Sequence, residues 1–241
     1  MGKNRTCGLV GNGVALKLGA IVWIVSIQSF LMQWWIASTW PKPYSPSINF
    51  ISDLGATSCG ILPGNIQHAA RYVCSPEHHW MNSSFVLSGI TIGIGAILLR
   101  ARLMPGALGF MATSLFITSG IGIAMVGLNP ENMQIVRHIV GAYLNAYGAS
   151  FAFILMGISL AKQRLNRRLG FFILGFGILS LLFNILYTIG FYGNLPFLSL
   201  GLGDGGMEKL CNYPIGILLI LIGFYALFQK IHPNIPLTLE A

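Results

Sequence analysis

The side chains that could carry out chemistry are few in this sequence: six Asp and Glu residues and five His residues among 241. His138 follows Arg137 and could act as a general acid or base if an acid such as Asp53 or Glu208 lies beside it. These residue types therefore give three catalytic candidates: His138, Asp53 and Glu208. The set that could instead bind a ligand consists of Asp53, Arg137, His138, Asn145, Asn184 and Glu208.

A second group, His68, His78 and His79, could hold a metal ion as a weaker alternative. Zinc sites need three or four ligands, and two of them are commonly paired on one helical turn. Adjacent histidines point in different directions on a helix, and no His-x-x-x-His or Cys-x-x-Cys spacing occurs in the chain. Ser75-Pro76-Glu77 is better interpreted as the start of a helix, with Ser75 as its cap. We therefore predict no metal and no other cofactor.

The composition decides which elements must position these side chains. Only 8% of the residues are charged, 54% are hydrophobic, and the mean hydropathy is +0.72. A soluble domain carries roughly 25% charged residues, and a disordered chain is polar and highly charged. The net charge of +8 comes from scattered bases, which does not suit nucleic-acid binding. The chain is therefore predicted to be an integral membrane protein.

The apolar runs predict an all-α fold: a polytopic transmembrane bundle of six helices in a single membrane domain, 1–241. A spanning helix needs roughly 20 mostly apolar residues, and the runs are continuous rather than alternating as in a barrel. The first run follows a basic N-terminus and is too long for a signal peptide. The six windows are Val14–Ile36, Met81–Leu99, Leu103–Leu128, Ile135–Ala161, Leu169–Tyr192 and Met207–Phe228.

The bases indicate an orientation with both termini in the cytoplasm, in the inner or plasma membrane of the cell. Ten bases then lie inside: Lys3, Arg5, Lys17, Arg100, Arg102, Lys162, Arg164, Arg167, Arg168 and Lys230. Four lie outside: Lys42, Arg71, Arg137 and Lys209. The outer side also receives five acids, Asp53, Glu77, Glu131, Asp204 and Glu208, so chemistry is expected at the outer face.

Three loops follow from this topology: a large outer loop at 37–79, a second outer loop at 193–206, and a basic cytoplasmic loop at 162–168. The first contains Cys59 and Cys74, and an oxidising compartment favours a disulfide between them. Cys211, near the outer end of the last span, is a competing partner.

Polar residues on the spans gather in the outer half of the membrane, which favours a cavity open to the outer face. We therefore predict binding of a lipid or other small amphiphile, with Asp53, Arg137, His138 and Glu208 at the mouth. One alternative is a lipid-modifying hydrolase or transferase that uses His138 with an acidic partner. A third is a transporter or an accessory subunit of a membrane complex. The expected partners are membrane lipids and no nucleic acid, and the oligomeric state is left open.

The motifs of this chain resemble those of domain of unknown function family 998, a family of bacterial and archaeal membrane proteins. The resemblance is carried by Tyr44–Pro46, Ile51–Gly55, Cys59-Gly60, Cys74–Pro76, Met81-Asn82, the His138 span, Gly206–Lys209 and Tyr213-Pro214. It implies six spans and a connection with lipids, but no established reaction. The zinc-dependent alkaline-ceramidase-like hydrolases fit less well, because the last span, Pro214–Phe228, has no histidine.

Overall fold

The computed structural model describes residues 3–63, 70–163 and 166–229. Its long helices are α1 (Lys3–Ile24), α2 (Ile27–Ser38), α3 (His78–Leu103), α4 (Gly106–Leu128), α5 (Ile135–Ala161), α6 (Arg167–Tyr192) and α7 (Gly203–Phe228). Its short elements are the 3₁₀ turn η1 (Ser52–Gly55), strands β1 (Gly60–Leu62) and β2 (Arg71–Val73), and the 3₁₀ turn η3 (Pro196–Ser199).

Within the described ranges, six helical segments are long and apolar enough to cross a membrane, which confirms the predicted all-α six-helix bundle. Helices α1 and α2 together supply the first of them, Gly13–Ser38, with a turn at Val25 and Ser26 between them. The last helix begins at Gly203, one turn before the apolar window at Met207, because the intervening polar and glycine residues are also helical.

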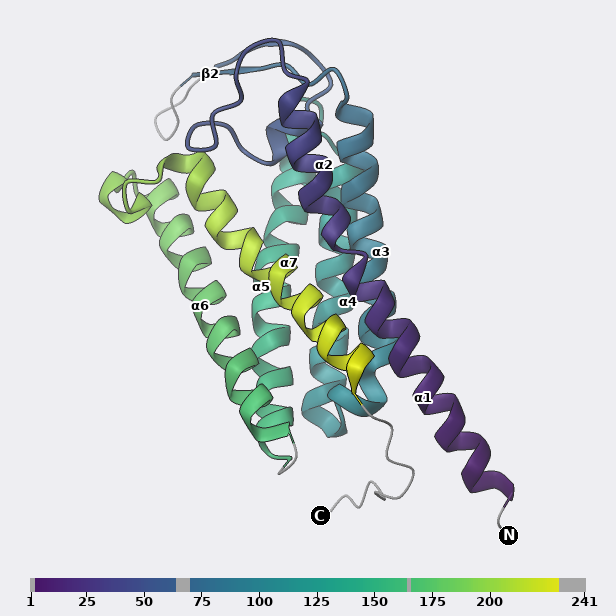
Figure 1. Cartoon of the computed structure of the whole chain (residues 1–241). Coiled ribbons are helices and arrows are strands. Elements are labelled where there is room, and N and C mark those ends of the chain that lie inside the picture. The colour runs from purple at the N-terminus through teal and green to yellow at the C-terminus, as the bar shows by residue number, and fades with distance from the viewer. Residues whose placement is uncertain (1–2, 64–69, 164–165, 230–241) are drawn as a thin grey trace.

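The helices form a closed ring in chain order (Figure 1). The first of them, α1, packs on α3, and each later helix then packs on the next as far as α7, which returns to α1. Small residues allow the close approaches that this ring needs. A side chain at Gly122 of α4 would come within 2.6 Å of the Gly141 carbonyl oxygen on α5. The core contains Trp23, Phe116 and Phe153, whose rings stack edge to face.

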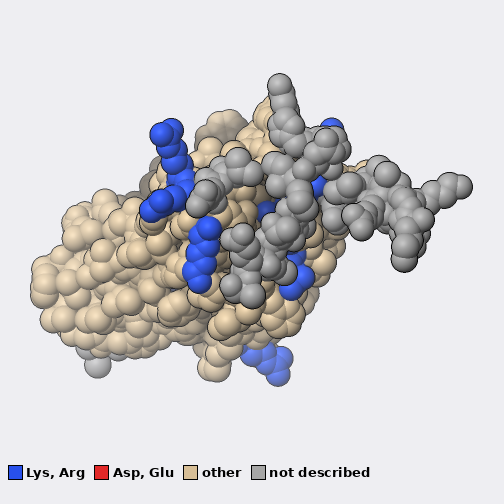
Figure 2. Space-filling model, turned by 90° about the horizontal axis from the view of Figure 1, so that it is seen from below, with Lys and Arg blue, Asp and Glu red and all other residues tan. Residues whose placement is uncertain are grey.

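The two ends of the bundle differ in charge. Residues 39–63 and 70–77 cover one end, here called the loop end, together with the turns 129–134 and 193–202 (Figure 1). All five acids that the structure describes lie there. Figure 2 shows the opposite end, here called the basic end, where lysine and arginine side chains project and no acid is visible. This end carries Arg100, Arg102, Lys162, Arg167 and Arg168, at the ends of α3, α5 and α6.

Candidate functional site

A disulfide-closed hairpin organises the loop end. Strands β1 and β2 pair antiparallel with Leu62 opposite Arg71, and a disulfide joins Cys59 and Cys74, which flank the two strands. The competing partner, Cys211, is a buried free thiol on α7. The register of this hairpin holds Arg71 over the short turn η1.

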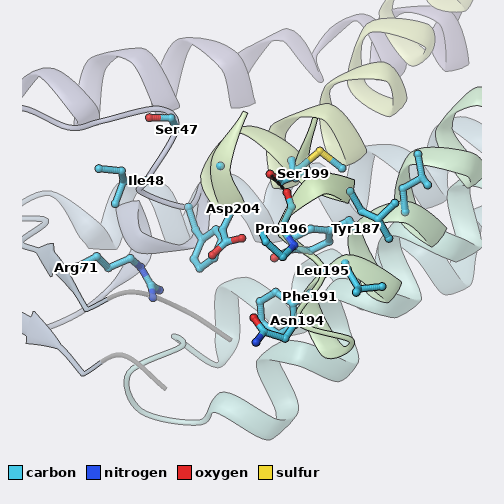
Figure 3. Close-up of a pocket in the computed structure, with 16 residues that line it drawn as sticks. Ser47, Ile48, Arg71, Tyr187, Phe191, Asn194, Leu195, Pro196, Ser199 and Asp204 are labelled. Carbon is cyan, nitrogen blue, oxygen red and sulfur yellow. Dashed lines mark hydrogen bonds between the residues drawn. The ribbon is translucent and has the colours of Figure 1, made fainter. Parts of the chain in front are cut away.

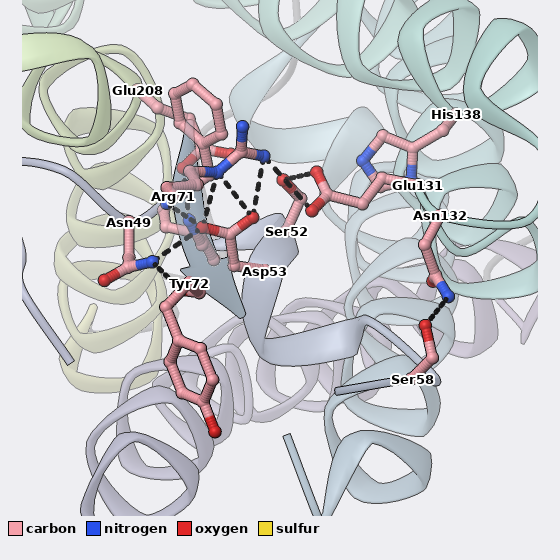
Figure 4. Close-up of polar contacts among 12 residues, drawn as sticks. Asn49, Ser52, Asp53, Ser58, Arg71, Tyr72, Glu131, Asn132, His138 and Glu208 are labelled. Atoms are coloured by element: carbon pink, nitrogen blue, oxygen red, sulfur yellow. Dashed lines mark hydrogen bonds and ion pairs between the residues drawn. The ribbon is translucent and has the colours of Figure 1, made fainter. Parts of the chain in front are cut away.

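Arg71 forms a bidentate ion pair with Asp53 of η1 (Figure 4). Its Nε lies 3.0 and 2.9 Å from the two carboxylate oxygens, and its Nη2 lies 2.8 Å from Oδ1. Asp53 is fully buried, and its Oδ2 also accepts hydrogen bonds from the Asn49 side chain at 3.1 Å and the Phe50 backbone N–H at 2.9 Å. The carboxylate is thus surrounded by donors, as a buried charge requires.

A second buried acid, Glu131 in the turn between α4 and α5, joins this pair. Its Oε1 lies 3.3 Å from Nη2 of Arg71, and its Oε2 accepts a hydrogen bond from the Ser52 hydroxyl at 2.7 Å. Burial, and then its hydrogen bond with Asp53, raise the pKa of Glu131 well above the usual value. Burial alone would raise the pKa of Asp53 too, but hydrogen bonds from Glu131 and Arg71 lower it below the usual value. The raised pKa favours the neutral form of Glu131, so one arginine faces two buried carboxyl groups of which Asp53 is the more acidic.

The start of α7 holds the same loop through its backbone. The Glu208 carboxylate accepts a hydrogen bond from the Ile51 N–H. The neighbouring Lys209 donates to the carbonyl oxygens of Pro46 at 3.0 Å and Asn49 at 2.8 Å. Side chains from α7 therefore bind backbone groups of the loop.

Tyr44 completes this contact from within the loop. Its hydroxyl donates to the carbonyl oxygens of Asn49 and Phe50, at 3.1 and 2.9 Å. Burial, and then the negative charges of Glu208 and Asp53, raise the pKa of Tyr44, so it remains a neutral donor. We call Asp53, Arg71, Glu131, Glu208 and Lys209 the loop anchor.

The three catalytic candidates are not joined into one catalytic group in the described structure. Asp53 and Glu208 belong to the loop anchor, whereas Nδ1 of His138 lies 2.9 Å from the Asn129 carbonyl oxygen at the end of α4. No hydrogen bond between His138 and either acid is found among the described residues. Arg137 is exposed at the start of α5.

The two predicted asparagines connect helices. Asn145 on α5 accepts from the Ser119 hydroxyl of α4 at 3.0 Å and donates to Asn212 of α7 at 3.2 Å. Asn184 on α6 donates to the Ser150 hydroxyl of α5 at 3.3 Å. Both residues are buried and act as cross-helix hydrogen-bonding groups.

The histidines proposed for a metal are only partly described, because His68 lies outside the described residues. Nδ1 of His78 lies 3.0 Å from the Ser75 carbonyl oxygen, and His79 lies 3.8 Å from Glu77. Within the described ranges, no three His, Cys, Asp or Glu side chains are placed to hold a metal ion. Ser75 does not cap α3 as expected, because its hydroxyl donates to the Leu54 carbonyl oxygen at 2.6 Å.

A pocket of about 320 Å³ lies beside the loop anchor, between the ends of α6 and α7, η3 and the loop (Figure 3). Arg71 lines it from the loop side, with its guanidinium 4.3 Å from the centre of the Phe50 ring. None of the six residues predicted to bind a ligand is among the lining residues. The wall is mostly apolar and includes Leu186, Tyr187, Gly190, Phe191, Leu198 and Met207.

Sequence reasoning missed the central role of Arg71. It placed Arg71 only among the outer bases and included Arg137, not Arg71, among the ligand-binding candidates. The sequence signal that could have indicated Arg71 is its position between Cys59 and Cys74. A disulfide between these cysteines holds the segment that contains Arg71 close to the segment before Cys59, which contains Asp53. Nothing in the sequence gave the register that places Arg71 over Asp53.

The fold and the loop anchor define a multi-pass membrane domain whose first loop is fastened over one end of a helical ring. The chain belongs to the family described as Protein of unknown function (DUF998), whose model matches residues 24–225. The resemblance carried by the loop and α7 motifs is therefore confirmed, and those motifs contain three loop-anchor residues, Asp53, Glu208 and Lys209. No curated protein and no solved structure matches the chain.

Proposed function

We propose that the protein binds a membrane lipid or similar amphiphile in the pocket at the loop end, and that this end lies on the outer side of the cell membrane. The observation that carries the proposal is the pocket itself: apolar side chains of a spanning helix form much of its wall, and charged side chains from the hairpin and from the start of α7 form its rim. Amphiphiles need these two surfaces next to each other.

The apolar wall comes from the last turns of α6. Leu186, Gly190 and Phe191 line the pocket together with Leu198 of η3 and Met207 of α7. Small-molecule pockets are typically about 300–1,000 Å³, so a volume of about 320 Å³ suits part of a lipid rather than a whole one. The best fit is the glycerol region and the start of one acyl chain.

The polar rim carries charges of both signs. Arg71 and Asp204 both line the pocket, and Ser47, Asn194 and Ser199 add neutral hydrogen-bonding groups (Figure 3). Arginine is well suited to phosphate, and a carboxylate is suited to an ammonium group. The rim therefore favours a zwitterionic phospholipid headgroup.

The test uses purified, delipidated protein and native mass spectrometry with added phosphatidylethanolamine. Gly190→Leu adds a side chain inside the pocket, where the new Cβ would meet the Cβ of Leu198 at 3.1 Å. The matched control is Gly175→Leu, in the same helix, where a Cβ meets nothing within 4 Å. We expect wild type and the control to retain lipid and Gly190→Leu to lose at least about 80% of it, equivalent to about 1 kcal/mol.

Equal lipid retention by the two glycine variants would overturn the proposal. So would the absence of retained lipid in wild type under conditions in which the protein remains folded. Thermal unfolding in detergent checks that both variants are folded before their lipid content is compared.

A further inference from the structure

The basic end has a second pocket, of about 290 Å³, between α5 and α6. Six residues line it: Ile158, Ala161, Lys162, Arg167, Phe171 and Leu174. The first three come from the last turn of α5 and the residue after it. The others lie at positions i, i+4 and i+7 of α6, which form one stripe on that helix.

Close packing of the two helices shapes this pocket. A Cβ at Gly157 of α5 would lie 2.6 Å from the backbone nitrogen of Leu174, so the helix backbones nearly touch at that level. Below it, the side chain of Phe171 stands 53% exposed on the bundle surface. The resulting groove opens toward the surroundings of the bundle and has apolar walls.

Positive charge is concentrated at the mouth of the groove. Lys162 and Arg167 are both exposed, and the Arg167 guanidinium lies 5.6 Å from the centre of the Phe171 ring. Arg168 follows at once, and the basic end shows no acid in Figure 2. The five described acids lie at the opposite end, so no described carboxylate neutralises these bases.

We propose that this groove binds an anionic phospholipid, with its phosphate between Lys162 and Arg167 and an acyl chain along Phe171, Leu174 and Ile158. The combination of a cationic mouth and apolar walls on a membrane-spanning surface carries the proposal. A soluble anion would use the bases but not the apolar walls. Basic pockets between transmembrane helices are a recognised arrangement for anionic headgroups.

The experiment compares two neighbouring arginines of equal charge. Arg167→Gln removes a base that lines the groove, whereas Arg168→Gln removes one that does not. Delipidated protein is titrated with phosphatidylglycerol, with phosphatidylcholine of the same chains, and with inorganic phosphate. Binding is measured by native mass spectrometry, and Arg167→Lys tests whether charge alone is sufficient.

We expect one phosphatidylglycerol to bind more tightly than phosphatidylcholine. Removal of a single base near a membrane surface should weaken this binding about fivefold, so Arg167→Gln should show that loss. Arg168→Gln should change it less than twofold, and Arg167→Lys should retain most of it. The fivefold loss should shrink as salt is raised, because exposed charges are screened.

Equal effects of Arg167→Gln and Arg168→Gln would overturn the proposal, because they would show a diffuse attraction to the whole basic end. Equal affinities for the two lipids would also overturn it. Displacement of phosphatidylglycerol by millimolar inorganic phosphate would overturn it too, because it would show that the bases bind anions without the apolar groove. Since Gly190→Leu leaves this end unchanged, the two lipid sites can fail independently.

Discussion

Replacing Arg71 by methionine should release the first loop from the loop end without unfolding the helical ring. The change removes three hydrogen bonds to Asp53 and one to Glu131 while keeping most of the side-chain volume. Asp53, which is fully buried, would then keep a negative charge without its positive partner.

The size of the effect follows from what remains around Asp53. Breaking a buried ion pair by removing one partner costs roughly 3–5 kcal/mol. Asp53 keeps its hydrogen bonds from Asn49 and from the Phe50 N–H, so we expect a value near the lower limit, about 3 kcal/mol. A free energy of that size corresponds to a roughly 100-fold increase in the population of the released loop.

Hydrogen exchange detected by mass spectrometry measures this release directly. Amide protection in peptides covering residues 45–56 should fall about 100-fold in Arg71→Met, whereas peptides from α4 and α5 should change little. Lys42→Met is the control, because it removes an exposed base from the same loop. Its cation–π contact with Tyr72, at 4.4 Å, predicts less than a fivefold change.

A double variant separates the loss of the pair from the loss of the arginine itself. Asp53→Asn combined with Arg71→Met leaves no unpaired buried charge, so protection should recover at least tenfold relative to Arg71→Met alone. The reasoning is refuted if Arg71→Met leaves residues 45–56 as protected as in wild type. It is also refuted if the loss of amide protection at residues 45–56 in the double variant equals the sum of the losses, in free energy, of the two single variants.

Three further expectations concern the rest of the fold. A raised pKa gives Glu131 stability that is full below its usual value of 4.5 and is lost as pH rises through the higher folded value. Glu131→Gln, which does not titrate, should therefore abolish a decline in thermal midpoint as the pH rises above 4.5; a decline of unchanged slope would exclude this origin. Replacing Cys59 and Cys74 by serine should destabilise the loop by about 3 kcal/mol, measured as exchange in peptides 52–63, and unchanged exchange would argue against it. Asn145→Leu should lower bundle stability by about 1 kcal/mol in a denaturant titration, because the Ser119 hydroxyl loses its acceptor; a stabilised variant would contradict this role.

The helical ring could be predicted from the sequence because span formation depends on local composition. The apolar window Ile135–Ala161 has the same bounds as α5. The start of α7 was placed late because Gly203–Gly206 are not apolar, and hydropathy does not register that they are helical. The turn at Val25 and Ser26 was not predicted because the residues on both sides of it are apolar, so hydropathy shows one continuous span.

The loop anchor could be predicted only in part. The sequence marked Asp53 and Glu208 as unusual because acids are rare in such a chain. Their partners are far away along the chain, and the local periodicity of the sequence gives no information on such contacts. Arg71 is 18 residues from Asp53, and Glu131 is 60 residues from Arg71. Arg137 is exposed at the start of α5 and its predicted role in ligand binding stays a prediction, because the direction of a side chain at the first turn of a helix depends on how that helix is rotated in the ring.

The hydrogen bond from the Ile51 N–H to Glu208 also determines an order of assembly. The two residues are 157 positions apart in the chain. At a synthesis rate of roughly 5–20 residues per second, about 8 to 30 seconds separate the appearance of the loop from that of its final holder. Throughout that interval, the loop segment around Ile51 lacks its contacts with Glu208 and Lys209, beside a ring that is still open. The last helix therefore closes the ring and completes the contacts that hold the first loop. A chain that stops before α7 would lack the closed ring and these loop contacts.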